Sequence, residues 1–210
     1  FLKSIFQEFE IIQQPIDAVI HFAGLKSVIN SLEQPLNYWD VNVNGSINLL
    51  RVMNEFNCYK FVFSSSATIY RSDSPVKISE NHFLKPINPY GNTKLTIERI
   101  LDDLFFSESK KWKVANLRYF NPAGAHPLGL IGEKPKTDST NLFPMILKVL
   151  DNKLEFLSIF GNDWPTKDGT CVRDFIHVMD LAEAHYLSLK YLNKNEPQNI
   201  KLNVGTGEGF

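Results

Sequence analysis

Cysteine is scarce in this chain of 210 residues, and neither sign of charge dominates. Cys58 and Cys171 lack the spacing of a metal site, and two isolated thiols in a chain of this size are typical of a reducing compartment, here the cytoplasm. The formal net charge is −1, with acids and bases mixed, which argues against nucleic acid or a membrane surface as partner. No apolar run approaches the roughly 18 residues of a membrane span. The hydrophobic share of 43% predicts a packed globular core.

A glycine-rich phosphate loop is also missing where one would be expected. A dinucleotide-binding fold usually opens with a strand, a glycine-rich turn and a helix, followed by an acidic residue. None of these precedes the first predicted strand, and both ends look cut, so we expect about two strand–helix units to be lacking. The segment Gly205-Thr206-Gly207-Glu208-Gly209 lies near the other end of the chain and is interpreted as a turn after a late strand. Neither a P-loop nor Gly-x-Ser-x-Gly occurs, which excludes NTPase and esterase motifs.

Strand and helix patterns alternate along the chain. Short apolar runs predict strands at 17–22, 60–63, 114–120, 154–160, 170–176 and 201–204, and helical patterns cover 1–13, 35–56, 89–106, 141–152 and 178–192. This alternation predicts an α/β fold, a Rossmann-like doubly wound parallel sheet with a smaller α/β substrate-binding region. Residues 121–140 are rich in proline, glycine and polar side chains, and are expected to form an irregular loop over a cleft.

The most informative stretch runs from Ser64 to Lys94. Asn88 is a good helix N-cap and Pro89 suits the first helical position. Tyr90 and Lys94 then lie one turn apart on the same helix face. A phenol has an ordinary pKa of about 10, which a nearby ammonium lowers. With the hydroxyl of Ser66 at the end of the preceding strand, these residues predict a proton-transfer site, although Tyr90 and Lys94 taken alone would more often be an exposed helix pair.

Several further motifs follow one another in order. They are His21-Phe22-Ala23-Gly24-Leu25-Lys26, Phe63-Ser64-Ser65-Ser66-Ala67-Thr68-Ile69-Tyr70, Tyr90-Gly91-x-x-Lys94, Leu117-Arg118-Tyr119-Phe120-Asn121-Pro122, Ile159-Phe160-Gly161-Asn162-Asp163, Val172-Arg173-Asp174 and Ile176-His177-Val178. This ordered set covers nearly the whole chain, and it resembles the UDP-glucose 4-epimerases, a family of extended short-chain dehydrogenases/reductases.

The resemblance implies a bound NAD and an isomerase of galactose metabolism that interconverts UDP-glucose and UDP-galactose by transient oxidation at C4 of the sugar. The implied catalytic residues are Tyr90, Lys94 and Ser66. The implied cofactor contacts are Phe22, Ala23, Gly24, Lys26, Ser64, Tyr90, Lys94 and Tyr119. The implied substrate contacts are Ser66, Ala67, Thr68, Phe120, Asn121, Asn141, Leu142, Ile159, Phe160 and Arg173, whose guanidinium suits a diphosphate.

The resemblance also divides the chain. Residues 1–120 and 172–204 would form the NAD-binding domain, and residues 121–171 and 205–210 would belong to the substrate-binding region. A homodimer is implied, formed through the helices expected at 35–56 and 89–106. No metal is expected, because His177 and Asp180 lack a third ligand at suitable spacing.

Two alternatives stay open. The first is another nucleotide-sugar epimerase or dehydratase of the same superfamily. Dehydratases carry acidic residues where this chain has Ala67 and Thr68, and acidic groups are needed to eliminate water. The other is a non-catalytic, nucleotide-sugar-binding fragment. Asn92 and Thr93 replace the usual Lys-Ser of the family, and are expected to face away from Tyr90 and Lys94 with little effect.

Overall fold

The computed structural model describes residues 1–71, 77–107, 111–133 and 141–210. They form two compact units: residues 1–119 with 183–204, and residues 120–182 with 205–210. The first unit contains a parallel sheet with helices, which confirms the predicted α/β, Rossmann-like fold. The assignment of NAD to one domain and substrate to the other stays a prediction.

The main sheet has four parallel strands in the order β1-β2-β3-β6. They are β1 (Ala18–His21), β2 (Lys60–Ser66), β3 (Lys113–Tyr119) and β6 (Gln198–Val204). Since the strands are parallel, their carboxyl ends lie at one edge, which is where ligands bind in sheets of this kind. The predicted strand at 60–63 extends through the three serines, so that Ser64, Ser65 and Ser66 belong to the sheet.

The helices of the first unit lie before β1 or between these strands in the sequence. They are α1 (Leu2–Ile11), α2 (Val28–Glu33), α3 (Pro35–Tyr38), a π-helix (Trp39–Asn44), α4 (Gly45–Glu55), a 3₁₀ turn (Ala67–Ile69), α5 (Pro89–Ser107) and α7 (Val178–Lys194), whose last twelve residues belong to this unit. The helix predicted at 35–56 is thus three consecutive segments with a π-helical centre. The helix α2 was not predicted, although Ser27 caps it by accepting from Asn30 N at 3.2 Å.

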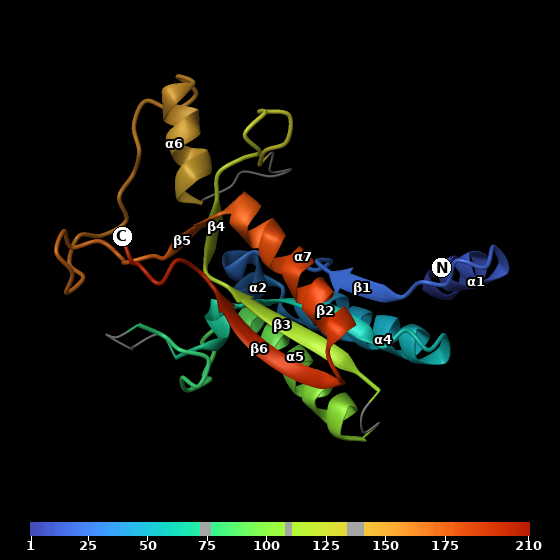
Figure 1. Ribbon diagram of the computed structural model, residues 1–210. Coiled ribbons are helices and arrows are strands. Elements are labelled where there is room, and N and C mark those ends of the chain that lie inside the picture. Colours follow the sequence, from blue (N-terminus) through green and yellow to red (C-terminus); the bar gives the residue numbers. More distant parts are fainter. Residues whose placement is uncertain (72–76, 108–110, 134–140) are drawn as a thin grey trace. The chain divides into compact units, whose positions relative to one another are not determined.

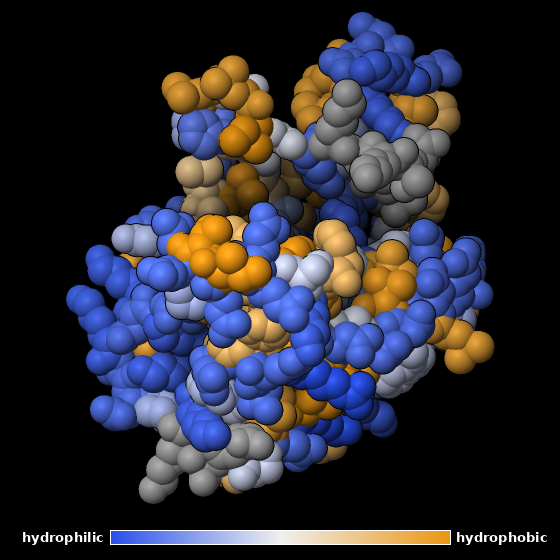
Figure 2. Space-filling model, turned by 90° about the vertical axis from the view of Figure 1, so that its right-hand side faces the viewer, coloured by the Kyte–Doolittle hydropathy of each residue, from blue (hydrophilic) through white to orange (hydrophobic). Residues whose placement is uncertain are grey.

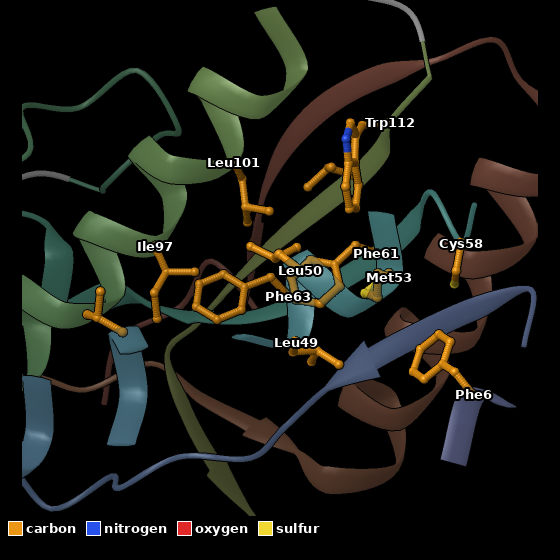
Figure 3. Packing of buried hydrophobic residues seen from close by; sticks show 12 residues of the cluster. Phe6, Leu49, Leu50, Met53, Cys58, Phe61, Phe63, Ile97, Leu101 and Trp112 are labelled. Carbon is orange, nitrogen blue, oxygen red and sulfur yellow. The ribbon is translucent and has the colours of Figure 1, made fainter. Parts of the chain in front are cut away.

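The core of the first unit lies between the sheet and the helices α4 and α5. Figure 3 shows Phe61 and Phe63 of β2 beside Leu50 and Met53 of α4 and Ile97 of α5. Alternate residues of a strand point to opposite faces, so Phe61, Phe63 and then Ser65 face these helices. Residues 183–194 of α7 cover the other face, as Figure 1 shows.

The second unit contains β4 (Asn121–Ala123), β5 (Phe175–His177), α6 (Leu142–Leu150) and the start of α7. The strands β4 and β5 pair in parallel. Two predictions are wrong here: residues 154–160 form no strand, and of the strand predicted at 170–176 only its end is found, in β5. The loop predicted at 121–140 contains β4, and its residues 134–140 lie outside the described part of the chain.

The surface combines polar and apolar side chains. Figure 2 shows hydrophobic groups in orange among hydrophilic ones on one face of the molecule. Exposed apolar residues of the first unit include Ile11, Ile29, Leu32, Leu36 and Phe106. Among the helices that the structure describes, none is both long and apolar enough to cross a membrane.

Candidate active site

The amino-terminal end of α5 approaches the turn after β2 closely. Asn88 caps the helix, because its Oδ1 accepts a hydrogen bond of 2.8 Å from Gly91 N, as its position before Pro89 predicted. A β-carbon on Gly91 would lie 2.7 Å from the carbonyl oxygen of Thr68 and 2.9 Å from Cβ of Pro86. Only glycine therefore allows the first turn of α5 to pack against the residues that follow Ser66.

Lys94 reaches from the second turn of α5 into the sheet. Its side chain is buried, and Nζ donates a hydrogen bond of 2.7 Å to the carbonyl oxygen of Ser64. The ammonium lies 4.9 Å from the ring centroid of Phe63 and 5.8 Å from that of Tyr90. Burial lowers the pKa of Lys94 from 10.5 to about 8, so the ammonium is still charged at neutral pH.

Tyr90 lies near Ser66, but its pKa differs from the prediction. Burial raises the pKa of Tyr90, and the hydrogen bond with Ser66 lowers it only in part. The expected lowering of the Tyr90 pKa by Lys94 is not found. The reason is geometric, because the ammonium lies 5.8 Å from the phenol ring and is bonded to the backbone of β2 instead.

Ser66 ends β2 and organises the following turn. Its Oγ accepts from Thr68 N at 3.2 Å and from Thr68 Oγ1 at 2.9 Å, which leaves the hydroxyl hydrogen of Ser66 available to an acceptor. Ala67 and Thr68 form the 3₁₀ turn and are half-buried. Ser66, Tyr90 and Lys94, predicted from three places in the sequence, are thus brought together at the carboxyl edge of the sheet.

The loop after β1 carries the predicted contacts Phe22, Ala23, Gly24 and Lys26, all of them exposed. Asn42 of the π-helix holds this loop, because its Oδ1 accepts from Leu25 N at 2.7 Å and its Nδ2 donates to Leu25 O at 3.0 Å.

Asn42 was missed by sequence reasoning. It also donates to Thr93 Oγ1 at 3.2 Å, and Thr93 Oγ1 donates to the Tyr90 carbonyl oxygen at 2.7 Å. Thr93 is fully buried and its hydroxyl joins Asn42 to the first turn of α5, whereas the expected small effect of the replacement stays a prediction. The sequence signal that could have identified Asn42 is its place between Val41 and Val43, as a polar residue on the apolar face of the helix predicted at 35–56.

Tyr119 ends β3, and its side chain lies on the sheet face opposite α5. Its hydroxyl is hydrogen-bonded to Nε2 of His185 in α7, and the His185 ring lies 4.6 Å from that of Phe22. Burial raises the pKa of Tyr119, whereas a hydrogen bond with Ser64 opposes the shift. These contacts bring the predicted cofactor contacts Phe22, Ser64 and Tyr119 into one cluster, to which the unpredicted His185 belongs.

The remaining predicted substrate contacts lie in the second unit. Asn121 is tied to the residue after Arg173, because its N and Nδ2 each donate to the carbonyl oxygen of Asp174 at 3.0 Å. Phe120 is half-buried, while Asn141, Leu142 and Arg173 are exposed. Ile159 and Phe160 are 70% and 95% exposed, which places them on the surface of this unit and not in a formed pocket.

The segment Gly205 to Gly209 is a turn after β6, as predicted. Asp174 organises it by accepting from Thr206 N and Gly207 N, each at 2.8 Å. A β-carbon on Gly205 would lie 2.5 Å from Oδ2 of Asp174. In the ranges that the structure describes, no three His, Cys, Asp or Glu residues gather as a metal site would require.

A model of the NAD dependent epimerase/dehydratase family matches residues 6–205. The chain is 50% identical over 207 residues to a UDP-glucose 4-epimerase of Bacillus subtilis, and 49% identical over 195 residues to one of Dictyostelium discoideum. These matches cover 98% and 93% of the chain, but 59% and 56% of the two relatives. The chain therefore spans little more than half the length of these relatives.

Solved structures give the same picture. A UDP-glucose 4-epimerase of Stenotrophomonas maltophila with bound NAD and a formylated UDP-arabinopyranose superposes with a TM-score of 0.90 at 44% identity. One of Bifidobacterium longum in complex with NAD⁺ and UDP superposes with a TM-score of 0.89 at 41% identity. The matches cover 100% and 99% of this chain, and 60% and 61% of those chains.

Proposed function

The chain belongs to the NAD dependent epimerase/dehydratase family, and we propose that it carries the proton-transfer site of an enzyme that interconverts UDP-glucose and UDP-galactose. The relatives named above support the substrates. The observation that carries the proposal is the convergence of Tyr90, Lys94 and Ser66 at the carboxyl end of β2. A phenol, an ammonium and a hydroxyl suit the reversible oxidation of a secondary alcohol, which must lose a proton as the C4 hydrogen leaves as hydride.

The roles of the three residues follow from their chemistry. As a phenolate, Tyr90 takes the proton of the sugar 4-hydroxyl and later returns it. The burial that raises the pKa of Tyr90 favours the protonated phenol, so the phenolate needs the positive charge of Lys94 nearby. The Ser66 hydroxyl hydrogen-bonds the reacting oxygen and keeps it beside the phenol.

The chemistry of Lys94 and of the loop after β1 supports NAD at the predicted contacts of the first unit. An ammonium has three N–H donors, and Ser64 O accepts one from Lys94, so others can serve ribose hydroxyls. A β-carbon on Gly24 would lie 3.0 Å from Asn42 Oδ1, so a larger residue there would press on the side chain that holds this loop. We assign cofactor contacts to Phe22, Ala23, Gly24, Lys26, Ser64, Tyr90, Lys94 and Tyr119. NAD, when bound, supplies the hydride acceptor and donor for C4.

The substrate contacts assigned to Phe120, Asn121, Asn141, Leu142, Ile159, Phe160 and Arg173 stay a proposal, as do those of Ser66, Ala67 and Thr68. Arg173 is exposed, and its Nη1 donates to the carbonyl oxygen of Val172 at 3.1 Å. A guanidinium can bind two oxygens of a diphosphate. Arg173→Met is expected to raise KM for the UDP-sugar while the unfolding midpoint is unchanged. An unchanged KM would remove Arg173 from the substrate site.

Epimerisation is favoured over elimination by Ala67 and Thr68, since neither side chain can act as the acid that expels water. The test is to incubate the complete gene product with UDP-galactose and identify the sugar formed. UDP-glucose is expected, and Tyr90→Phe should lose most turnover while retaining NAD. Release of a 4-keto-6-deoxy sugar would show a dehydratase.

The non-catalytic alternative concerns residues 1–210 by themselves. We propose that they bind NAD weakly or not at all, because the described residues offer no glycine-rich phosphate loop before β1. Gel filtration of residues 1–210 after incubation with NAD tests this, and co-elution of NAD would contradict it.

We further propose a cytoplasmic homodimer. Both cysteines are free thiols, one buried and one exposed, which suits a reducing compartment. A shallow apolar hollow between α4 and α5 supports the dimer, and its lining includes Ile47, Leu50, Ile100 and Leu104. Pairs of helices with such faces associate readily.

A further inference from the structure

A buried ion pair lies one helical turn past Lys94. The side chains of Glu98 in α5 and Arg118 in β3 are each 1% exposed, and Arg118 Nη2 lies 2.7 Å from Glu98 Oε2. Arg118 Nε also donates to Glu98 Oε1 at 3.1 Å. Such a two-point contact between an arginine and a carboxylate sets direction as well as distance, so it fixes how α5 lies on β3.

The same carboxylate holds a second strand. Ser65 Oγ of β2 donates to Glu98 Oε1 at 2.5 Å, and Ser65 is the register partner of Arg118 in the sheet. Glu98 thus binds two neighbouring strands at the same level. Ser65 lies between Ser64, whose carbonyl oxygen accepts from Lys94, and Ser66, which lies beside Tyr90.

Three successive turns of α5 therefore meet three successive serines of β2. Tyr90 meets Ser66, Lys94 meets Ser64, and Glu98 meets Ser65. The contact of Glu98 is the one that also includes the neighbouring strand.

Arg118 extends the network to the residues after the 3₁₀ turn. Its Nη1 donates to the hydroxyl of Tyr70 at 2.8 Å and to the carbonyl oxygen of Glu80 at 2.9 Å. The Tyr70 hydroxyl in turn donates to Asn203 Oδ1 of β6 at 2.6 Å. The ion pair of Glu98 and Arg118 is therefore connected to β2, β3, β6 and α5. Through Tyr70 it also holds the segment that follows Ser66 along the chain.

Stability alone is a weak reason for such a pair, because buried ion pairs can often be replaced by apolar groups of similar size without loss. We propose that Glu98 and Arg118 are positioning residues, which hold α5 in register with β2 so that Tyr90 stays beside Ser66 and Lys94 beside Ser64. The effect of this register on turnover rests on the function proposed above. Neither residue needs to touch substrate or cofactor.

The test uses the complete gene product with Glu98→Gln and Arg118→Met combined. The glutamine oxygen can still accept from Ser65, and the methionine fills the space of the arginine without leaving a buried charge. We expect the unfolding midpoint and KM to stay near those of the wild type and kcat to fall about tenfold to a hundredfold, since displacements of about 1 Å can have such effects. A folded variant with the wild-type kcat would overturn the proposal.

A matched control lies one turn further along α5. Asp102 and Lys201 of β6 form an ion pair at 2.7 Å, with side chains 31% and 32% exposed. Asp102→Asn combined with Lys201→Met removes an ion pair between helix and sheet farther from the serines, and kcat is expected to stay unchanged. An equal fall of kcat in both double variants would show a general loosening of α5 and overturn the specific role.

Two further measurements cover the remaining outcomes. If the double variant does not fold, Arg118→Lys is the alternative, because lysine keeps the charge but makes one contact where arginine makes two. A reduced kcat is expected for Arg118→Lys, and a wild-type kcat overturns the proposal.

If the wild type does not convert UDP-galactose, the proposed function fails, but this inference can still be tested. Tyr90, labelled with carbon-13 at Cζ, is then titrated by NMR. Tyr90 should titrate at lower pH in the double variant than in the wild type, because its burial is relaxed, and an unchanged titration overturns the proposal.

Discussion

The buried ammonium of Lys94 donates a hydrogen bond of 2.7 Å to the carbonyl oxygen of Ser64, which ties the second turn of α5 to the end of β2. The cation of the site is thus held in place by the backbone, and its charge at neutral pH is retained in spite of burial.

Removing Lys94 should change how stability depends on pH. In the folded protein its pKa is about 8, against an ordinary 10.5, so between these pH values the unfolded chain binds the extra proton. Stability from this group therefore rises as pH increases through that window, by at most about 1.4 kcal/mol per pH unit. Urea unfolding of the wild type and Lys94→Met from pH 8 to 10 should show a less positive slope for the variant, and equal slopes would contradict the assignment.

His21 should contribute to acid sensitivity. Burial lowers its pKa from 6.5 to about 4, and Lys94 adds to the shift, so the folded state keeps the imidazole neutral while the unfolded state takes up a proton. This contribution of His21 to stability is complete above pH 6.5 and is lost as pH falls towards 4, by about 3 kcal/mol in total. In His21→Gln the loss of stability between those pH values should be smaller than in the wild type, and Ser46→Ala, which removes only the hydroxyl 3.0 Å from His21 Nε2, should keep most of the dependence.

Gly91→Ala should displace Tyr90, its neighbour in the first turn of α5. The new methyl group would meet backbone 2.7 Å away, so we expect about 1–3 kcal/mol lower stability and a fall in kcat. The control is Gly45→Ala, also in a helix, where nothing lies within 4 Å of the added carbon and stability should rise by about 0.5–1 kcal/mol. Thermal unfolding and turnover of both variants decide the matter, and a neutral Gly91→Ala would contradict the close approach.

Leu104→Glu should separate the proposed dimer. Leu104 lines the apolar hollow between α4 and α5. A carboxylate at this position would lose its hydration when the second copy binds, and this loss disfavours the dimer. Sedimentation velocity of the complete gene product should show a dimer for the wild type and a monomer for the variant. Phe83→Glu, at an exposed loop residue, is the control, and a dimer in both variants would place the interface elsewhere.

Local features were predictable from the sequence, whereas partners distant in the sequence were not. The cap at Asn88 and the helix that carries Tyr90 and Lys94 follow from neighbouring residues, and the structure has both. The strand predicted at 154–160 failed because its pattern cannot reveal whether a partner strand exists.

The pKa values of the site were likewise not predictable, because they depend on partners distant in the sequence. Spacing along the helix places Lys94 beside Tyr90, but the partner of Lys94 is a backbone oxygen of β2, and burial raises the pKa of Tyr90. The network of Glu98 and Arg118 joins residues 20 apart in the sequence. The only sign of this network in the sequence was a charged residue within each of two apolar patterns, Glu98 in the predicted helix at 89–106 and Arg118 in the predicted strand at 114–120.

The most direct test of transient oxidation at C4 follows deuterium. UDP-galactose labelled with deuterium at C4 is converted by the complete gene product in ordinary water, and the label is located in the product by NMR and mass spectrometry. The account predicts UDP-glucose with the deuterium still at C4, because the hydrogen that leaves as hydride is returned to the same carbon. A product whose C4 hydrogen comes from water, or a label moved to another carbon, would contradict it.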